Sequence, residues 1–189
     1  MAHETIRSFL AVTLSEAIKK EAYLFVKTIQ DQCSGFRFVD SQNWHLTLHF
    51  LGQVETEKIE ELKTRLPKAL TNIKPFLISL EGFGAFPNER KPRILWMGIK
   101  SDSDELLNLK KALDEVLREM HFEIETRPYH PHITIARSKE GTSTSLPSSS
   151  PMFKGRVVDQ IHAVTLFKSD LSPEGARHTP LQIVPFGSL

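Results

Sequence analysis

Histidine and threonine occur together at strand spacing in one short stretch of the sequence. His132 and Thr134 alternate with Ile133 and Ile135, and β-branched residues of this kind favour a strand. Successive side chains of a strand point to opposite faces, so the imidazole and the hydroxyl share one face while the isoleucines anchor the other in a core. The polar face could bind an anion, because both groups donate hydrogen bonds.

The same His-apolar-Thr-apolar pattern occurs at residues 45–48. The composition of the chain would produce about 0.09 such matches by chance, so two matches need an explanation. For one copy alone, a histidine that satisfies its hydrogen bonds inside a core is the simpler interpretation. Two copies favour a shared function.

A single shift of 87 residues carries His45 onto His132 and Thr47 onto Thr134. The same shift aligns Phe9 with Trp96, Val12 with Ile99 and the capping Ser15 with Asp102. We therefore expect two similar strand–helix–strand units, at about residues 6–52 and 93–137, related by a pseudo-two-fold axis. Such an axis would bring the two polar rows face to face.

Hydrophobic periodicity predicts the elements around these motifs. Strands are expected at 6–12, 36–39, 45–51, 76–83, 94–99, 161–167 and 181–185. Helices are expected from Ser15 to Gly35, from Thr56 with a kink or an early end at Pro67, and from the caps at 101–103 to Met120. Residues 84–93 and 138–151 are predicted loops, the second of them mobile.

The composition is that of an ordinary globular protein. Of 189 residues, 40% are hydrophobic and 25% charged, and the net charge of +1 offers no broad attraction for duplex nucleic acid. The single cysteine excludes an internal disulfide and fits a reducing compartment. No apolar run approaches the length of a membrane span. We expect a cytoplasmic, monomeric protein that does not bind membranes.

Together with their flanks, the two motifs resemble a known family. The motifs themselves resemble those of the two-histidine phosphoesterases. The flanks 43–44, 50–52, Pro131, 136–137, 167–171 and 175–176 resemble bacterial RNA 2′,3′-cyclic phosphodiesterases, also called 2′-5′ RNA ligase-like proteins. The resemblance covers nearly the whole chain. It implies a single bilobal α+β domain over 1–189, with two antiparallel sheets around a central cleft and helices on the outside.

The resemblance also implies the roles of individual residues. His45 would be the proton donor to the leaving 3′ oxygen and His132 the proton acceptor from water. Thr47, Thr134 and Arg137 would bind the substrate, without a metal or a cofactor. His178 stands where this family usually has a tyrosine, which leaves that contact open.

The expected chemistry follows from the residue types. Opening a cyclic phosphate by in-line attack needs a base that takes a proton from water and an acid that protonates the departing oxygen opposite. Two facing imidazoles meet this need near neutral pH. Thr47 and Thr134 could each donate a hydrogen bond to a non-bridging oxygen. From the residues alone, the acid and the base cannot be told apart.

Residues next to the motifs remain candidates. Arg137 has the opposite strand parity to His132, so it reaches the cleft only if the strand bends or ends before it. His49 has the parity of His45; it either lines the cleft or is a partly exposed polar residue at a strand end. His130 and His132 could suggest a metal, but no acidic or cysteine ligand nearby completes a set. The basic loop at 90–93, with Phe83 and Phe86 close by, could hold RNA or could be a solvated surface.

Three functions are compatible with this sequence. The leading one is metal-independent hydrolysis of RNA or nucleotide 2′,3′-cyclic phosphate to a 2′-phosphomonoester. The second is a related phosphoesterase or ligase that acts on 2′-5′ linkages or another cyclic phosphate. The third is a nucleotide- or RNA-binding module without turnover. Both histidines and both threonines are present, which favours the enzymes.

Overall fold

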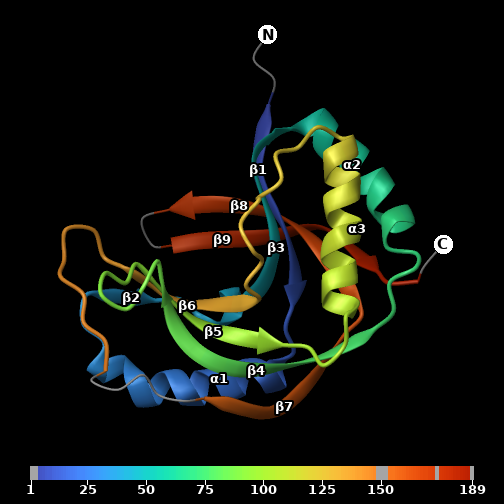
Figure 1. The fold of residues 1–189 in the computed structure, drawn as a ribbon. Helices are drawn as coiled ribbons and strands as arrows, with labels where there is room; N and C mark the ends of the chain where they lie inside the picture. The colour runs from blue at the N-terminus through green and yellow to red at the C-terminus, as the bar shows by residue number, and fades with distance from the viewer. Residues whose placement is uncertain (1–3, 148–152, 173–174, 188–189) are drawn as a thin grey trace.

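Two antiparallel sheets form the framework of the protein (Figure 1). The computed structural model describes residues 4–147, 153–172 and 175–187. The first sheet has the order β3-β1-β8-β9, with β1 (Thr5–Thr13), β3 (His45–Glu55), β8 (Ala163–Ser172) and β9 (Gly175–Pro185). The second has the order β2-β6-β5-β4-β7, with β2 (Phe36–Phe38), β4 (Phe76–Phe86), β5 (Ile94–Lys100), β6 (His132–Ser138) and β7 (Lys154–Ile161). The α+β architecture with two antiparallel sheets is therefore confirmed.

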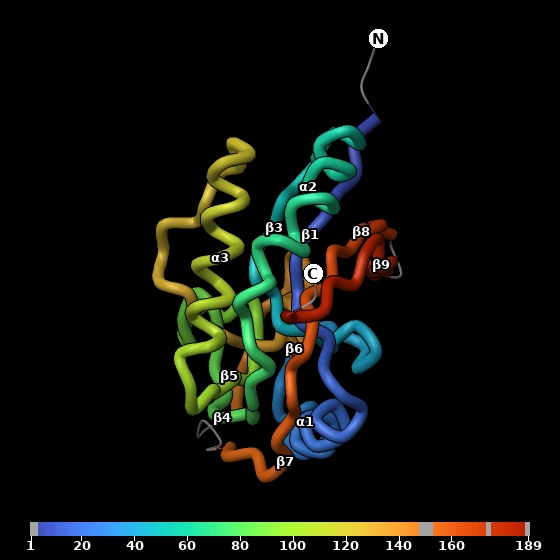
Figure 2. The backbone as a smooth tube through the Cα atoms, turned by 90° about the vertical axis from the view of Figure 1, so that its right-hand side faces the viewer, coloured from blue at the N-terminus to red at the C-terminus, as the bar shows by residue number. Residues whose placement is uncertain are grey.

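Three helices cover the sheets: α1 (Glu16–Ile29), α2 (Thr56–Ala69) and α3 (Glu105–Glu119). Each buries the apolar face that its sequence predicts. α1 follows β1 of the first sheet but packs against β4 and β7 of the second. α2 packs against the first sheet and against α3, which follows β5 of the second (Figure 1). Figure 2 shows α3 and the β8–β9 pair on opposite sides of β1 and β3. None of the described helices is long and apolar enough to cross a membrane.

The two motif strands lie in different sheets, and each pairs with the strand that opens its unit. β3 pairs with β1, and β6 pairs with β5. The registers of the two pairs differ by two residues when the units are aligned by the shift of 87. Thr47 lies opposite Ala11, whereas Thr134 lies opposite Trp96, which is the counterpart of Phe9. A shift of two keeps every side chain on its face. The apolar residues of both motifs are buried in the core, as expected: Leu46, Leu48, Ile133 and Ile135.

Both motif strands contain a bulge at the same place. In the β1–β3 pair the register skips Leu48, and in the β5–β6 pair it skips Ile135. A bulge adds one residue and resets the alternation of the side chains beyond it. His49 and Ala136 therefore turn to the core, and the residues after them return to the face of the motif histidines.

Helix α2 continues past Pro67 to Ala69, so the prediction that this proline ends the helix early is wrong. A proline at this position leaves the carbonyl of Lys63, four residues earlier, without its helical donor. The side-chain amide of Gln182 in β9 donates to that carbonyl over 3.2 Å. The tertiary contact satisfies the group that the proline leaves unpaired.

Other boundaries differ from the prediction because pairing, not composition, sets them. The predicted strand 161–167 is two strands that belong to different sheets, ending at Ile161 and starting again at Ala163. β4 includes the first three residues of the predicted loop 84–93, and β3 runs on past Gly52 to Glu55. β9 starts at Gly175 rather than at residue 181, and the N-cap of α3 is Asp104 rather than a residue of 101–103.

Part of the predicted mobile loop 138–151 is anchored. The backbones of Ser34 and Ser145 exchange two hydrogen bonds, of 3.3 and 3.2 Å. Residues 148–151 lie outside the described part of the chain.

Candidate active site

The two motif histidines are held in the same way. Nδ1 of His45 lies 2.7 Å from the carbonyl oxygen of Asn43, and Nδ1 of His132 lies 2.6 Å from that of His130. A carbonyl only accepts, so Nδ1 carries the proton in both rings. In the neutral imidazole, Nε2 is then a free lone pair, which can take a proton from a ligand or, once protonated, return one.

The histidines come from different sheets, and His132 lies close enough to His45 to affect its pKa. Burial above all, together with His178, Arg137 and His132, lowers the pKa of His45 to about 4, although the hydrogen bond to the carbonyl of Asn43 acts in the opposite direction. Burial, followed by the charges of His130 and Arg137, also lowers the pKa of His132. Both imidazoles are therefore neutral at pH 7 in the free protein.

Aromatic rings surround each histidine. The ring centroid of His45 lies 4.8 Å from that of Phe9, which stacks on it, and 5.2 Å from that of His178, which meets it edge-on. His132 meets Phe86 edge-on with centroids 5.1 Å apart. These rings exclude water from one side of each imidazole. Loss of hydration disfavours the charged ring, which explains why the pKa of each histidine is lowered.

The threonines stand on the same face of their strands as the histidines. Thr47 and Thr134 are both half-buried and lie two residues after His45 and His132. Neither hydroxyl has a hydrogen-bond partner within the described residues, and both are accessible enough to donate to a ligand. The structure thus keeps each hydroxyl beside its imidazole.

Arg137 also reaches this site. The bulge at Ile135 resets the alternation of side chains in β6, so residue 137 returns to the face that carries His132. Its charge lowers the pKa of His45, His132 and His178. Among the described residues it forms no ion pair. The guanidinium is thus available to an anion placed between the histidines.

His49 does not line the site, and both sequence-based interpretations of it are wrong. The bulge at Leu48 turns it to the core, where it is only 6% exposed. Its Nε2 lies 2.7 Å from the carboxylate of Asp114 and 2.8 Å from Nζ of Lys110, both in α3. Burial and the charge of Lys110 lower the pKa of His49 to about 4, so the ring is neutral.

Two site residues escaped the sequence analysis because only the tertiary structure brings them in. Phe50 occupies the place in β3 that Arg137 has in β6, lies 6.3 Å from Phe9 between ring centroids, and is 67% exposed. Burial lowers the pKa of Arg137, and Arg7 of β1 lies close enough to lower it further. The bulge that turns Phe50 towards the site leaves no signal in the pattern of a single sequence.

His178 packs against the site where the resemblance left its contact open. Its ring lies edge-on to Phe9, with centroids 4.9 Å apart, and its Nδ1 is buried without a partner among the described residues. Burial and the charges of Arg137 and Arg7 lower its pKa. It therefore forms a neutral wall beside His45.

The described residues contain no group of three or more histidine, cysteine or acidic side chains that could hold a metal ion. His130 is exposed and its ring instead lies 4.5 Å from that of Trp96 between centroids. In the basic loop, the side chain of Asn88 accepts from the backbone of Arg90 and Lys91. Phe86, next to this loop, belongs to the site through its contact with His132.

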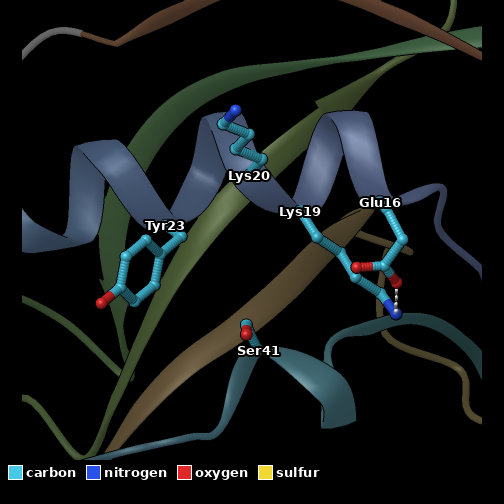
Figure 3. Close-up of a pocket in the computed structure, with 5 residues that line it drawn as sticks. All are labelled: Glu16, Lys19, Lys20, Tyr23 and Ser41. Atoms are coloured by element: carbon cyan, nitrogen blue, oxygen red, sulfur yellow. Dashed lines mark hydrogen bonds and ion pairs between the residues drawn. The ribbon is translucent and has the colours of Figure 1, made fainter.

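Two cavities lie outside the pair of histidines. One of about 220 Å³ is formed by α1 and Ser41, with Lys19 paired to Glu16 across its edge, and contains neither histidine (Figure 3). The other, of about 510 Å³, is lined by residues of β4, of β5 with Trp96 among them, and of the start of α3, and also by His130 and Pro131. The larger cavity therefore adjoins the His132 side of the site.

Comparison with known proteins shows the family of this chain. A family model described as LigT like Phosphoesterase matches residues 12–96 and 98–178. The chain belongs to the LigT-like phosphoesterase family. The RNA 2′,3′-cyclic phosphodiesterase of Thermotoga maritima is 34% identical over 134 residues, 71% of each chain. That of Methanocaldococcus jannaschii is 33% identical over 173 residues, 90% of this chain and 95% of the relative.

Solved structures share the whole fold of this chain. TT0787 of Thermus thermophilus superposes with a TM-score of 0.84 at 26% identity, covering 97% of this chain and 99% of that one. LigT of E. coli in complex with 3′-AMP gives a TM-score of 0.77 at 26% identity, with coverage of 97% and 99%. The protein is thus a LigT-like phosphoesterase along nearly its full length.

Proposed function

We propose that this LigT-like phosphoesterase hydrolyses the 2′,3′-cyclic phosphate of RNA ends or small nucleotides to a 2′-phosphomonoester, without a metal or a cofactor. The observation that carries the proposal is the matched pair of histidines, each with Nδ1 bound to a backbone carbonyl and Nε2 free. The names of the relatives, RNA 2′,3′-cyclic phosphodiesterases, support the substrate. The complex of E. coli LigT with 3′-AMP supports a nucleotide ligand.

In the proposed mechanism, Nε2 of His132 takes a proton from water as the water oxygen bonds to phosphorus. The bond from phosphorus to the 3′ oxygen breaks opposite, and protonated Nε2 of His45 gives that oxygen its proton. Thr47, Thr134 and Arg137 bind the non-bridging oxygens, on which charge builds. Phe50, exposed at the edge of the site, offers a surface on which a base can stack.

To act as the acid, His45 must be protonated, and the free protein disfavours the protonated ring. Its pKa of about 4 reflects burial first and the electrostatic influence of its neighbours, the Arg137 guanidinium among them, second. An anionic phosphate beside the ring offsets both effects and stabilises the imidazolium. In this mechanism the substrate therefore brings His45 into its acid form.

The test is an oligonucleotide that ends in a 2′,3′-cyclic phosphate, incubated with the pure protein with and without a chelator. We expect equal turnover in both, and a single 2′-phosphomonoester in the phosphorus NMR spectrum, since in-line attack selects one leaving oxygen. Loss of activity with chelator and rescue by a divalent ion would contradict the metal-free mechanism. A mixture of isomers, or the 3′ isomer alone, would contradict the roles given to His45 and His132.

A second candidate, formation or cleavage of a 2′-5′ linkage, is favoured by the cavity of about 510 Å³ next to His132. In ligation, a 5′-hydroxyl would replace water beside the base, and a cavity of this size accommodates a nucleoside. Adding an oligonucleotide with a free 5′-hydroxyl tests it, because a longer product with a 2′-5′ bond is then expected. The cytoplasmic location, the monomeric state and the absence of membrane binding stay predictions.

A further inference from the structure

The two motif strands, β3 and β6, lie against each other where the two sheets meet. β3 is the edge strand of the first sheet, so the backbone groups on its outer side have no strand partner there. β6 lies against β3 across this boundary. β2 pairs with β6 only from Ala136 to Ser138, beyond the second motif. The separation of the two histidines therefore depends on contacts across a boundary that no strand pairing closes.

One hydrogen bond crosses this boundary at the first motif. The hydroxyl of Tyr129 donates to the backbone carbonyl of Thr47 over 3.0 Å, although the residues are 82 apart in the chain. Tyr129 stands three residues before His132, and its side chain packs against the core. Burial raises the pKa of Tyr129 far above its ordinary value, so the hydroxyl keeps its proton and stays a donor.

A partly buried polar cluster supports the same strand from behind. Asp114 accepts from Nζ of Lys110 over 2.6 Å, and both lie against the ring of His49 in β3. Nζ of Lys110 also lies 5.7 Å from the centroid of the Tyr129 ring, within the range of a cation–π contact. The cluster joins α3, which follows β5 of the second sheet, to the edge strand of the first.

We propose that Tyr129 is a positioning residue that fixes the first motif relative to the second, with the Lys110–Asp114–His49 cluster as its support. In-line transfer needs both Nε2 atoms at set positions on opposite sides of phosphorus. A small displacement costs far more in the transition state than in substrate binding. Tyr129 acts through Thr47 and His132 and does not itself touch the reacting atoms. The inference rests on the proposed hydrolysis for its kinetic consequence.

The experiment compares Tyr129→Phe with Tyr23→Phe, since these are the only two tyrosines of the chain. Tyr23 is 46% exposed and lines the cavity of α1. We expect Tyr129→Phe to lower kcat about tenfold with KM within about twofold, while Tyr23→Phe changes neither. Asp114→Asn should lower kcat in the same direction, with the exposed Asp31→Asn as its control. An unchanged kcat in Tyr129→Phe, or a loss that follows the thermal midpoint alone, overturns the proposal.

A second readout does not need turnover. NMR relaxation of the histidine rings should show new exchange broadening at His45 and His132 in Tyr129→Phe, with His121 and His162 as unaffected internal standards. If wild type fails to hydrolyse a cyclic phosphate but this broadening appears, the proposed function fails and the positioning role stands. If wild type is active and neither kcat nor the ring signals change in the variant, the positioning role fails and the function stands.

Discussion

A carbonyl two residues earlier in the chain fixes the proton on Nδ1 of both motif histidines. Each ring therefore leaves Nε2 free for a ligand. This arrangement suits the base role that we propose for His132, because a base needs a free lone pair. In the proposed acid role, His45 must first gain a proton.

At the residue scale, His45→Ala and His132→Ala should each lower kcat at least about 100-fold, because general acid or base catalysis is worth about 10²–10⁴. The circular dichroism spectrum should stay that of the folded protein. Thr47→Val and Thr134→Val should cost about tenfold to 100-fold, as the loss of one hydrogen bond to the developing charge. A histidine variant with near full activity, or one that is inactive only because it unfolds, would instead favour structural core histidines.

The proton on His45 gives a separate prediction. Because burial and the Arg137 guanidinium, among other neighbours, hold its pKa at about 4 in the free protein, binding of an anion should raise the pKa of His45 and take up a proton at pH 7. Calorimetric titration with a 2′-nucleotide product in buffers of different ionisation enthalpy measures this uptake. His45→Gln should abolish it, and proton release or no exchange by the wild type would contradict the account.

At the element scale, the bulge decides which side chains reach the site. If the strands were regular, with no bulge at Leu48 or Ile135, parity would place His49 in the site and Arg137 outside it. The bulges reverse both positions. They bring residues of different type to equivalent places, exposed Phe50 on one strand and Arg137 on the other.

Arg137 should matter for phosphate recognition through its planar guanidinium. Arg137→Lys keeps the charge but not the forked geometry, so kcat/KM should fall less than in Arg137→Ala, where a loss of about tenfold or more is expected. The basic loop supplies a matched control, since Arg90→Ala removes an exposed arginine outside the site. Steady-state kinetics with a cyclic-phosphate oligonucleotide decides. Equal losses in Arg137→Ala and Arg90→Ala would argue for a merely electrostatic contribution.

At the scale of the whole molecule, the candidate active site lies where the two sheets meet. The helices connect the two sheets. α1 follows β1 of the first sheet but packs on the second, and α3, which follows β5 of the second sheet, packs against α2 on the first. The two sheets are thus held together by side chains, among them His49 with Asp114 and Tyr129 with Thr47.

Bringing several neutral histidines into the folded protein makes its stability depend on pH. The pKa values of His45, His49, His132 and His178 are all lowered on folding. The unfolded chain therefore binds more protons below its ordinary histidine pKa of about 6.5. The stabilisation is fully present above that pH and is lost progressively as the pH falls towards about 4, the folded pKa of His45 and His49.

Urea unfolding at pH 7.5, 6 and 5 should accordingly show a falling midpoint. His45→Gln should weaken this dependence, whereas His162→Gln, at an exposed position, should leave it as in the wild type. A midpoint that stays constant across this range would mean that the histidines are not buried in the neutral form.

The sequence by itself determined the local features of this protein. Alternation of polar and apolar residues is a nearest-neighbour property, so it identified both motif strands, the faces of the three helices, and Thr47 and Thr134 beside their histidines. The motif flanks were specific enough to indicate the family and, through it, the two-sheet fold.

Only the tertiary structure decided which residues act together. A bulge depends on how a strand pairs with its neighbour, so the positions of His49, Phe50 and Arg137 could not be read from parity. Pro67 is tolerated because Gln182, far away in the chain, satisfies the carbonyl it leaves unpaired. Strands 154–161 and 163–172 separate at His162 because each pairs in a different sheet. In each case the deciding partner is distant in sequence, and the local pattern carries no record of it.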